Sequence, residues 1–181
     1  MSKKATKKKI NSCRKGKRNE NDLCHALNER FGEGAFARIP TSGARSRSVK
    51  NKDAKVAYTG DLITPENFRF SIESKSANIN IDFFASNATF DKWLKQAMDD
   101  AASVDKIPML CWKQPRKGWV VALPGRIWAS NGGYPPYYLR YACGTEQFRW
   151  GWIVCRLDAL LKANPKDDFW FKALPKEGRD E

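Results

Sequence analysis

Two carboxylates and a lysine stand at a spacing suited to the hydrolysis of a phosphodiester. Asp61 precedes Glu73 by twelve positions, and Lys75 follows Glu73 by two. Side chains two residues apart on a β-strand point to the same face, so Glu73 and Lys75 would lie side by side. Carboxylates bind hard divalent cations, and a neighbouring lysine can orient an attacking water. The pattern predicts a metal-dependent site; the alternative is an edge strand whose exposed Glu and Lys oppose unwanted pairing.

The residues around this pair alternate as in a half-buried strand. Apolar Phe68, Phe70 and Ile72 alternate with polar side chains over residues 68–75. One face of the strand should therefore enter the core while the other carries the two charged side chains. We expect Asp61 to come from the preceding strand, before a short turn.

Helices and further strands must hold this pair in place. Apolar periodicity predicts two helices, at residues 15–31 and 89–104, the first ended by Gly32 or Gly34 and the second capped by Asn87 or Thr89. Short apolar runs predict strands at 35–40, 56–58, 108–113, 118–123 and 150–155, with a last helix at 157–163. This order predicts an α/β or α+β domain, with a central mixed β-sheet flanked by helices.

Glu20 is a third acidic residue of interest, because it begins an apolar stripe. It lies three positions before Leu23, which recurs with Leu27 and Phe31 at helical spacing. One interpretation is an acid near the start of a helix that complements the helix dipole. The other is a carboxylate that leans into the metal site.

Length and composition favour a single domain. The chain has 181 residues, of which 41% are hydrophobic, and this is sufficient for one substantial core. We expect one domain over residues 15–181, with a core to residue 123 and an aromatic-rich extension of undefined role over 124–181. No apolar run reaches membrane-spanning length and the amino terminus does not read as a secretory signal, so we expect a cytoplasmic protein with no membrane partner.

The positive charge gathers at the amino terminus. The net charge is +13, and residues 1–18 contain nine Lys or Arg and no acid. We expect residues 1–14 to be a disordered basic tail that binds a polyanion through counterion release. The alternative is a tail that only improves solubility.

The cysteine and histidine residues do not indicate a metal site or a nucleophile. The chain has five Cys and one His, with no Cys-x-x-Cys pair, which disfavours a zinc site or a histidine-metal nuclease. Cys24 and His25 are adjacent, so on a helix they would face different directions and could not act as a nucleophile pair.

Aromatic residues concentrate in the second half of the chain. The segments around Trp112 and Trp128 and the range 134–141 are candidates for a dimer interface. The alternatives are burial in the core and stacking on unpaired bases.

The Asp and Glu-x-Lys pattern resembles the PD-(D/E)xK nuclease superfamily, with Gly60-Asp61 where Pro-Asp is usual. The first ~120 residues resemble the branch that contains archaeal-type Holliday-junction resolvases and related phage proteins. The motifs of that branch occur in order, as Lys-Gly-x-Arg-x-Glu at residues 15–20, a Ser-Gly loop at 41–45, Asp61, Glu73 with Lys75, Gln96 and a Pro-led strand from Pro108. The last ~60 residues depart from the compact archaeal form.

The resemblance implies a restriction-endonuclease-like core and a role for each matched residue. Asp61 and Glu73 would ligate Mg²⁺, which Mn²⁺ can replace, together with the backbone carbonyl of Ser74. Glu20 would contribute directly or through a water, and Lys75 would position the hydrolytic water.

Further residues would surround the scissile phosphate. The resemblance places Ser42 on a loop beside it and lets Gln96 orient a water or the substrate. Basic side chains would bind phosphates of the DNA backbone, at Lys15, Lys17, Arg18, Arg45, Arg47 and Lys50.

The function expected from these observations is a structure-selective DNA endonuclease that resolves four-way junctions. Its partners would be branched double-stranded DNA and a second copy of the chain in a homodimer, in the nucleoid of a bacterial, archaeal or virus-infected cell. Two alternatives stay open: a nuclease of the same superfamily that cuts forks, single strands or duplex, and a non-enzymatic basic protein that binds nucleic acid.

Overall fold

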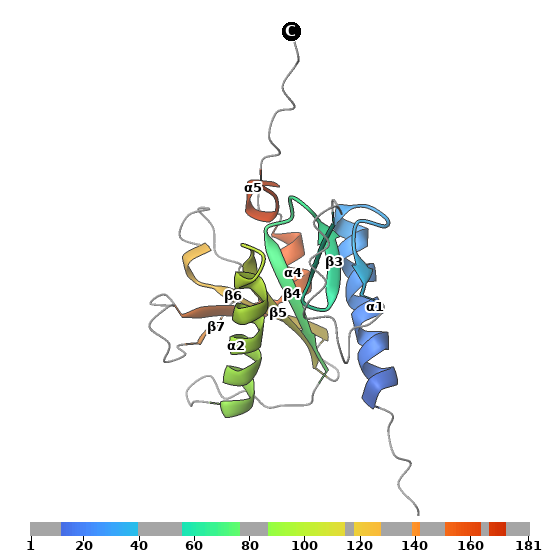
Figure 1. Cartoon of the computed structure of the whole chain (residues 1–181). Coiled ribbons are helices and arrows are strands. Elements are labelled where there is room, and N and C mark those ends of the chain that lie inside the picture. Colours follow the sequence, from blue (N-terminus) through green and yellow to red (C-terminus); the bar gives the residue numbers. More distant parts are fainter. Residues whose placement is uncertain are drawn as a thin grey trace, which may run out of the picture.

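The computed structural model describes residues 12–39, 56–76, 87–114, 118–127, 139–141, 151–163 and 167–172. Figure 1 shows their arrangement, and the helices and strands are α1 (Ser12–Phe31), β1 (Ala37–Arg38), β2 (Val56–Thr59), β3 (Leu62–Pro65), β4 (Phe70–Lys75), α2 (Ala88–Ala102), β5 (Ile107–Gln114), β6 (Gly118–Pro124), β7 (Leu139–Tyr141), β8 (Trp152–Arg156), α4 (Leu157–Lys162) and α5 (Asp167–Trp170). Within these ranges, no helix is both long enough and apolar enough to cross a membrane.

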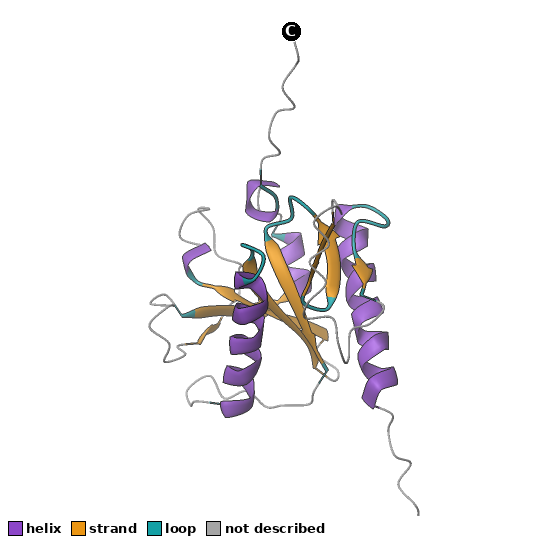
Figure 2. Cartoon of the chain, viewed as in Figure 1, coloured by secondary structure: helices purple, strands orange, loops and turns teal. Residues whose placement is uncertain are grey.

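The main sheet has five strands in the order β4-β5-β6-β8-β7. β4 pairs with β5 in parallel, and the other neighbours are antiparallel. The sheet is therefore mixed, as the sequence predicted. Its strands lie between helices, with α2 on one side and α1 and α4 on the other (Figure 2). A smaller sheet, in the order β1-β3-β2, lies beside the edge strand β4.

Alternation along the strands divides the core between the two faces of the main sheet. Phe70 and Ile72 of β4 pack with Leu23 and Leu27 of α1. The opposite face packs under α2 and carries Glu73 and Lys75, because side chains alternate along β4. The predicted apolar face of this strand is thus confirmed.

Local signals mark the ends of both long helices. α1 ends at Gly32, which has φ 111°, and its N–H donates to Asn28 O at 2.9 Å. The helix begins at Ser12, three residues before its predicted start and inside the range assigned to the basic tail. Asn87 caps α2, where Oδ1 accepts from the N–H groups of Thr89 and Phe90.

The carboxyl-terminal residues belong to the same core as the rest of the chain. β8 lies inside the main sheet, between β6 and β7, so no structural boundary falls at residue 123. In α5, Phe169 and Trp170 are both fully buried. Trp170 contacts the rings of Phe31, Phe68 and Phe70, which come from α1 and from the residues that lead into β4.

Backbone hydrogen bonds fix this carboxyl-terminal segment. Arg69 N–H donates to Trp170 O at 2.8 Å, and Lys172 N–H donates to Asn67 O at 2.7 Å. The guanidinium of Arg69 also donates to Asp168 O. The segment therefore holds the start of β4 in position.

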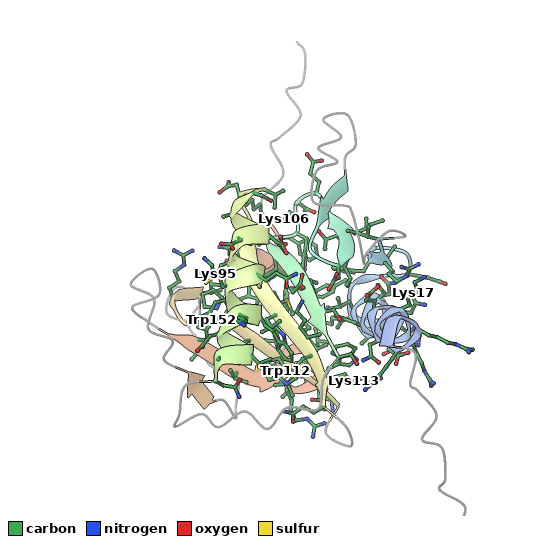
Figure 3. All side chains as sticks on the ribbon, turned by 60° about the horizontal axis from the view of Figure 1, so that its bottom comes forward. Lys17, Lys95, Lys106, Trp112, Lys113 and Trp152 are labelled. Carbon is green, nitrogen blue, oxygen red and sulfur yellow. The ribbon has the colours of Figure 1, made fainter. Side chains whose placement is uncertain are left out.

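Trp112 corrects one prediction about a dimer interface. Its side chain is fully buried beneath α2, where it meets the Phe90 ring at a centroid distance of 5.3 Å. Figure 3 shows Trp112 on the sheet, within the layer that α2 covers. A residue packed in this way cannot contact a second copy. Trp128 and residues 134–138 lie outside the described residues, and residues 139–141 form β7.

Replacing Trp170 tests whether the carboxyl-terminal segment is structural. Trp170→Ala removes a large buried ring, so we expect a loss of about 3–5 kcal/mol in the free energy of unfolding, measured with urea. Lys172→Ala, at an exposed position of the same segment, should cost less than about 1 kcal/mol. Equal and small effects of both changes would show that the segment is dispensable.

Candidate active site

The turn between β2 and β3 docks on the free edge of β4 and brings Asp61 into the site. Asp61 N–H donates to Ile72 O at 2.9 Å, and Ser74 N–H donates to Asp61 Oδ2 at 2.9 Å. An edge strand presents backbone groups that need partners, and Asp61 supplies one acceptor and one donor. The prediction that Asp61 lies on a strand is wrong: it stands in the turn that precedes β3.

Gly60 makes this docking possible. Its φ is 69°, and a Cβ placed on it would lie 2.1 Å from Ile72 O. A side chain would therefore both strain the backbone and separate the turn from β4. This explains why the residue before Asp61 is glycine.

Glu73 and Lys75 meet on β4 and are joined by Gln96 of α2. Lys75 Nζ forms an ion pair with Glu73 Oε1 and donates to Gln96 Oε1 at 2.8 Å. Gln96 Nε2 donates to Glu73 Oε1 at 2.6 Å. The Gln96 amide thus contacts both charged side chains of the Glu-x-Lys pair and fixes their positions relative to α2.

Glu20 and Arg38 line the other side of the site. Glu20 is 8% exposed, and its Oε2 lies 3.8 Å from an Arg38 guanidinium nitrogen. Arg38 belongs to β1, and the next residue, Ile39, donates its N–H to Asp61 O at 3.2 Å. The charge of Glu20 raises the pKa of Asp61, so the two carboxylates lie near each other. Glu20 stands outside the first turn of α1, which does not favour the helix-dipole interpretation, and its contribution to a metal site stays a prediction. Arg38 was not among the predicted site residues, although an arginine within the apolar run 35–39 was a signal for it.

Comparison with known proteins decides the family. Residues 11–170 match the model of a family described as "phage putative PDDEXK endonuclease". The chain belongs to this family. A curated relative is "Protein D14" of Escherichia phage T5, which is 30% identical over 122 residues, covering 63% of this chain and 71% of that protein. The fold is accordingly the restriction-endonuclease-like fold.

The structure brings the three predicted motif residues together. Asp61, Glu73 and Lys75 all lie at the edge of β4, and their assignment as the Asp, Glu and Lys of the family name stays a prediction. Ser74 meets Asp61 through its backbone N–H, whereas the metal-binding role of its carbonyl stays a prediction.

Burial raises the pKa of both carboxyl groups, so each is a weaker acid than usual. Desolvation raises the pKa of Asp61 to about 6, the Ser74 N–H opposes the rise, and the charge of Glu20 adds to it. Desolvation likewise raises the pKa of Glu73 to about 7, with repulsion from Asp61 second and the Lys75 ammonium opposing it. Asp100, one helical turn after Gln96, repels both carboxylates. Without a bound cation, the surroundings of Asp61 and Glu73 therefore disfavour their negatively charged forms.

The donor set fits a divalent cation that keeps several waters. Within the described residues, the hydrogen bonds of the two carboxylates use Asp61 Oδ2 and Glu73 Oε1, and the second oxygen of each makes no hydrogen bond there. No group of three or more His, Cys, Asp or Glu side chains in the described ranges is arranged to hold a metal. Mg²⁺ is commonly bound by only one or two carboxylates together with water and substrate phosphate, so two carboxylates are sufficient.

The predicted phosphate-binding residues divide into two groups. Lys15, Lys17 and Arg18 are exposed on α1. Figure 3 shows Lys17 on α1 and Lys95 on α2, on either side of β4. The other predicted residues lie outside the described residues: Ser42, Arg45, Arg47 and Lys50.

Gly60→Ala tests the docking of the turn on β4. The added Cβ must displace the turn, so we expect cleavage to fall by about a hundredfold, as when a group that orients a metal ligand is lost. Gly118→Ala is the matched control, because Gly118 also has positive φ, 79°, but a Cβ placed on it would meet no described atom within 4 Å. It should lose stability and keep its activity. Equal activities of the two variants would refute the docking.

A pH titration of stability tests the buried charge of Asp61. Its pKa in the folded protein lies above the ordinary value, so this group stabilises the fold at low pH and the stabilisation is lost as the pH rises through about 6. In EDTA, Asp61→Asn should match the wild type near pH 4 and exceed it near pH 8 by about 1–3 kcal/mol in urea unfolding. A variant less stable than the wild type near pH 8 would contradict this.

Proposed function

We propose that this protein is a Mg²⁺-dependent DNA endonuclease and that four-way junctions are its substrate. The observation that carries the proposal is the convergence of Asp61 and Glu73 at the edge of β4, beside a lysine held by Gln96. A buried and a half-buried carboxylate that repel each other favour a bound cation, and membership of a nuclease family agrees with that chemistry.

A divalent cation, when bound, would neutralise charge on the scissile phosphate and acidify the attacking water. Asp61 and Glu73 would hold it, with the Ser74 carbonyl and, directly or through a water, Glu20. Asp61 keeps its orientation through the Ser74 N–H, so the carboxylate is in place before the cation arrives.

Lys75 would position the attacking water. An ammonium has three donors, and two of them serve Glu73 Oε1 and Gln96 Oε1. The third can hold a water, which reaches the group because the Lys75 side chain is 20% exposed. Gln96 acts as a positioning residue, since it contacts Lys75 and Glu73 and fixes the direction of that third donor.

Phosphates of the DNA backbone would bind the basic side chains of α1. Lys15, Lys17 and Arg18 are exposed on α1, two to five residues before Glu20. We assign the same role to Arg45, Arg47 and Lys50, and we place Ser42 beside the scissile phosphate. The basic residues at the amino terminus would add sequence-independent affinity.

The choice of a four-way junction rests on the order of the motifs. The motifs from Lys15-Gly16 to Pro108 occur along the chain in the same order as the motifs of junction resolvases. Each chain carries one catalytic group, whereas resolving a junction requires two symmetric cuts. A two-fold homodimer supplies both sites in the simplest way.

Cleavage of a substrate panel tests this function. We expect the wild type to make paired cuts in a four-way junction with Mg²⁺ or Mn²⁺ and none in EDTA. Asp61→Asn should lose about a hundredfold or more in rate and still bind DNA, because it removes a cation ligand and no phosphate contact. The matched control is Asp105→Asn, an exposed aspartate far from the site, which should cut at the wild-type rate.

The panel also separates the alternatives. Cutting of forks, single strands or linear duplex in preference to the junction would keep the nuclease and reject the junction. Binding without cutting in any metal would favour the non-enzymatic alternative. Sedimentation of the free protein should show a dimer, and a strict monomer that nicks without paired cuts would reject resolution by a homodimer.

A further inference from the structure

Gly16 stands where a helix would be more stable with another residue. It lies inside α1, four residues after the helix begins, and glycine within a helix is less favourable than alanine. A Cβ placed on Gly16 would have one described neighbour within 4 Å, Glu20 Oε1 at 3.9 Å, which is an ordinary contact. Packing among the described residues therefore does not require glycine here.

Gly16 lies on the same face of α1 as Glu20 and Leu23. It precedes Glu20 by four positions and Leu23 by seven, so the three residues lie on one stripe of α1. Leu23 is buried against the sheet, and Glu20 is buried beside Arg38 and close to Asp61. Gly16 continues this stripe beyond the core, at the end of α1 that lies beside the carboxyl end of β4 (Figure 1). Gly16 is partly exposed, so the helix backbone has no side chain of its own at this position.

Two lysines flank this uncovered backbone. Lys15 and Lys17 are rotated about 100° to either side of Gly16 around the helix axis. Both are exposed. A strip of helix backbone thus lies between two ammonium groups and leads toward the buried carboxylate of Glu20. Such a strip can bind a narrow polyanion that passes close to the helix.

We propose that the phosphodiester backbone of the DNA substrate crosses α1 at Gly16 on its way to the site. This inference rests on the proposed function. The absence of a Cβ lets the sugar-phosphate chain approach the helix closely, and Lys15 and Lys17 contact the phosphates on either side. Glycine at this position trades helix stability for substrate contact, so stability and affinity should respond in opposite directions when it is replaced.

Gly16→Leu tests the crossing, with Asn21→Leu as the matched control. Asn21 is exposed and is rotated by about 140° from Gly16 around the helix axis, so it receives the same side chain off the strip of backbone at Gly16. Both changes are made in the full chain carrying Asp61→Asn, so that DNA is bound and not cut. Affinity for a fluorescent four-way junction and for duplex is measured in EDTA, and the midpoint of thermal unfolding is measured on the same samples.

We expect Gly16→Leu to weaken DNA binding by about tenfold while its unfolding midpoint stays equal or rises. Gly16→Ala should show a smaller loss of affinity and a higher midpoint. Asn21→Leu should bind as the parent does. Affinity that does not change in Gly16→Leu would overturn the inference. So would a lower unfolding midpoint, because it would show that another part of this chain covers Gly16. Failure of the proposed function is a separate result, because the wild-type protein would then not cut the four-way junction in Mg²⁺, whatever Gly16→Leu does to the affinity for DNA.

Discussion

The geometry of the candidate site depends on two hydrogen bonds that backbone N–H groups donate at the edge of β4. One joins Asp61 N–H to Ile72 O, and the other joins Ser74 N–H to the Asp61 carboxylate. They attach a short turn to an edge strand that would otherwise present unpaired groups. The same contact that completes the sheet edge thus fixes the distance between Asp61 and Glu73. Gly60 permits it, because no other residue could place its Cα so close to Ile72 O.

The rest of the fold supports that edge from both sides. α2 packs across one face and supplies Gln96 to Glu73 and Lys75. α1 packs across the other and supplies Glu20. Desolvation raises the pKa of both central carboxyl groups, so the fold loses stability by holding their negative charges there, in a place that favours a bound cation. Such a conflict between stability and charge is typical of functional sites.

Much of the site could be predicted from the sequence, because its residues carry periodic signals. Alternation over residues 68–75 placed Glu73 and Lys75 on one face, and helical spacing placed Glu20 toward the core. Asp61 was found by its spacing from Glu73, but its place in a turn depends on a close backbone contact that no pattern encodes. Gln96 was named through a resemblance alone, and its bridge between Glu73 and Lys75 needs the packing of α2.

Long-range contacts explain what the sequence did not reveal. Arg38 enters the site only because β1 pairs with β3. Likewise α5 has only four residues, too few for a helical period to be recognised. Its role comes from aromatic rings that are distant in the chain, at Phe31 and Phe68. The segment around Trp112 was a candidate for an interface, with burial in the core as an alternative, because aromatic composition does not distinguish core from surface.

Anomalous diffraction from crystals of the protein soaked in Mn²⁺ tests the central claim most directly. Mn²⁺ shares the oxygen ligands and octahedral geometry of Mg²⁺. We predict an anomalous peak at the edge of β4, about 2.0–2.3 Å from one oxygen each of Asp61 and Glu73, the oxygens that Ser74 N–H and Lys75 do not use. A protein that cuts DNA in Mn²⁺ but shows no peak there, or shows its peak at another group of residues, would contradict the account.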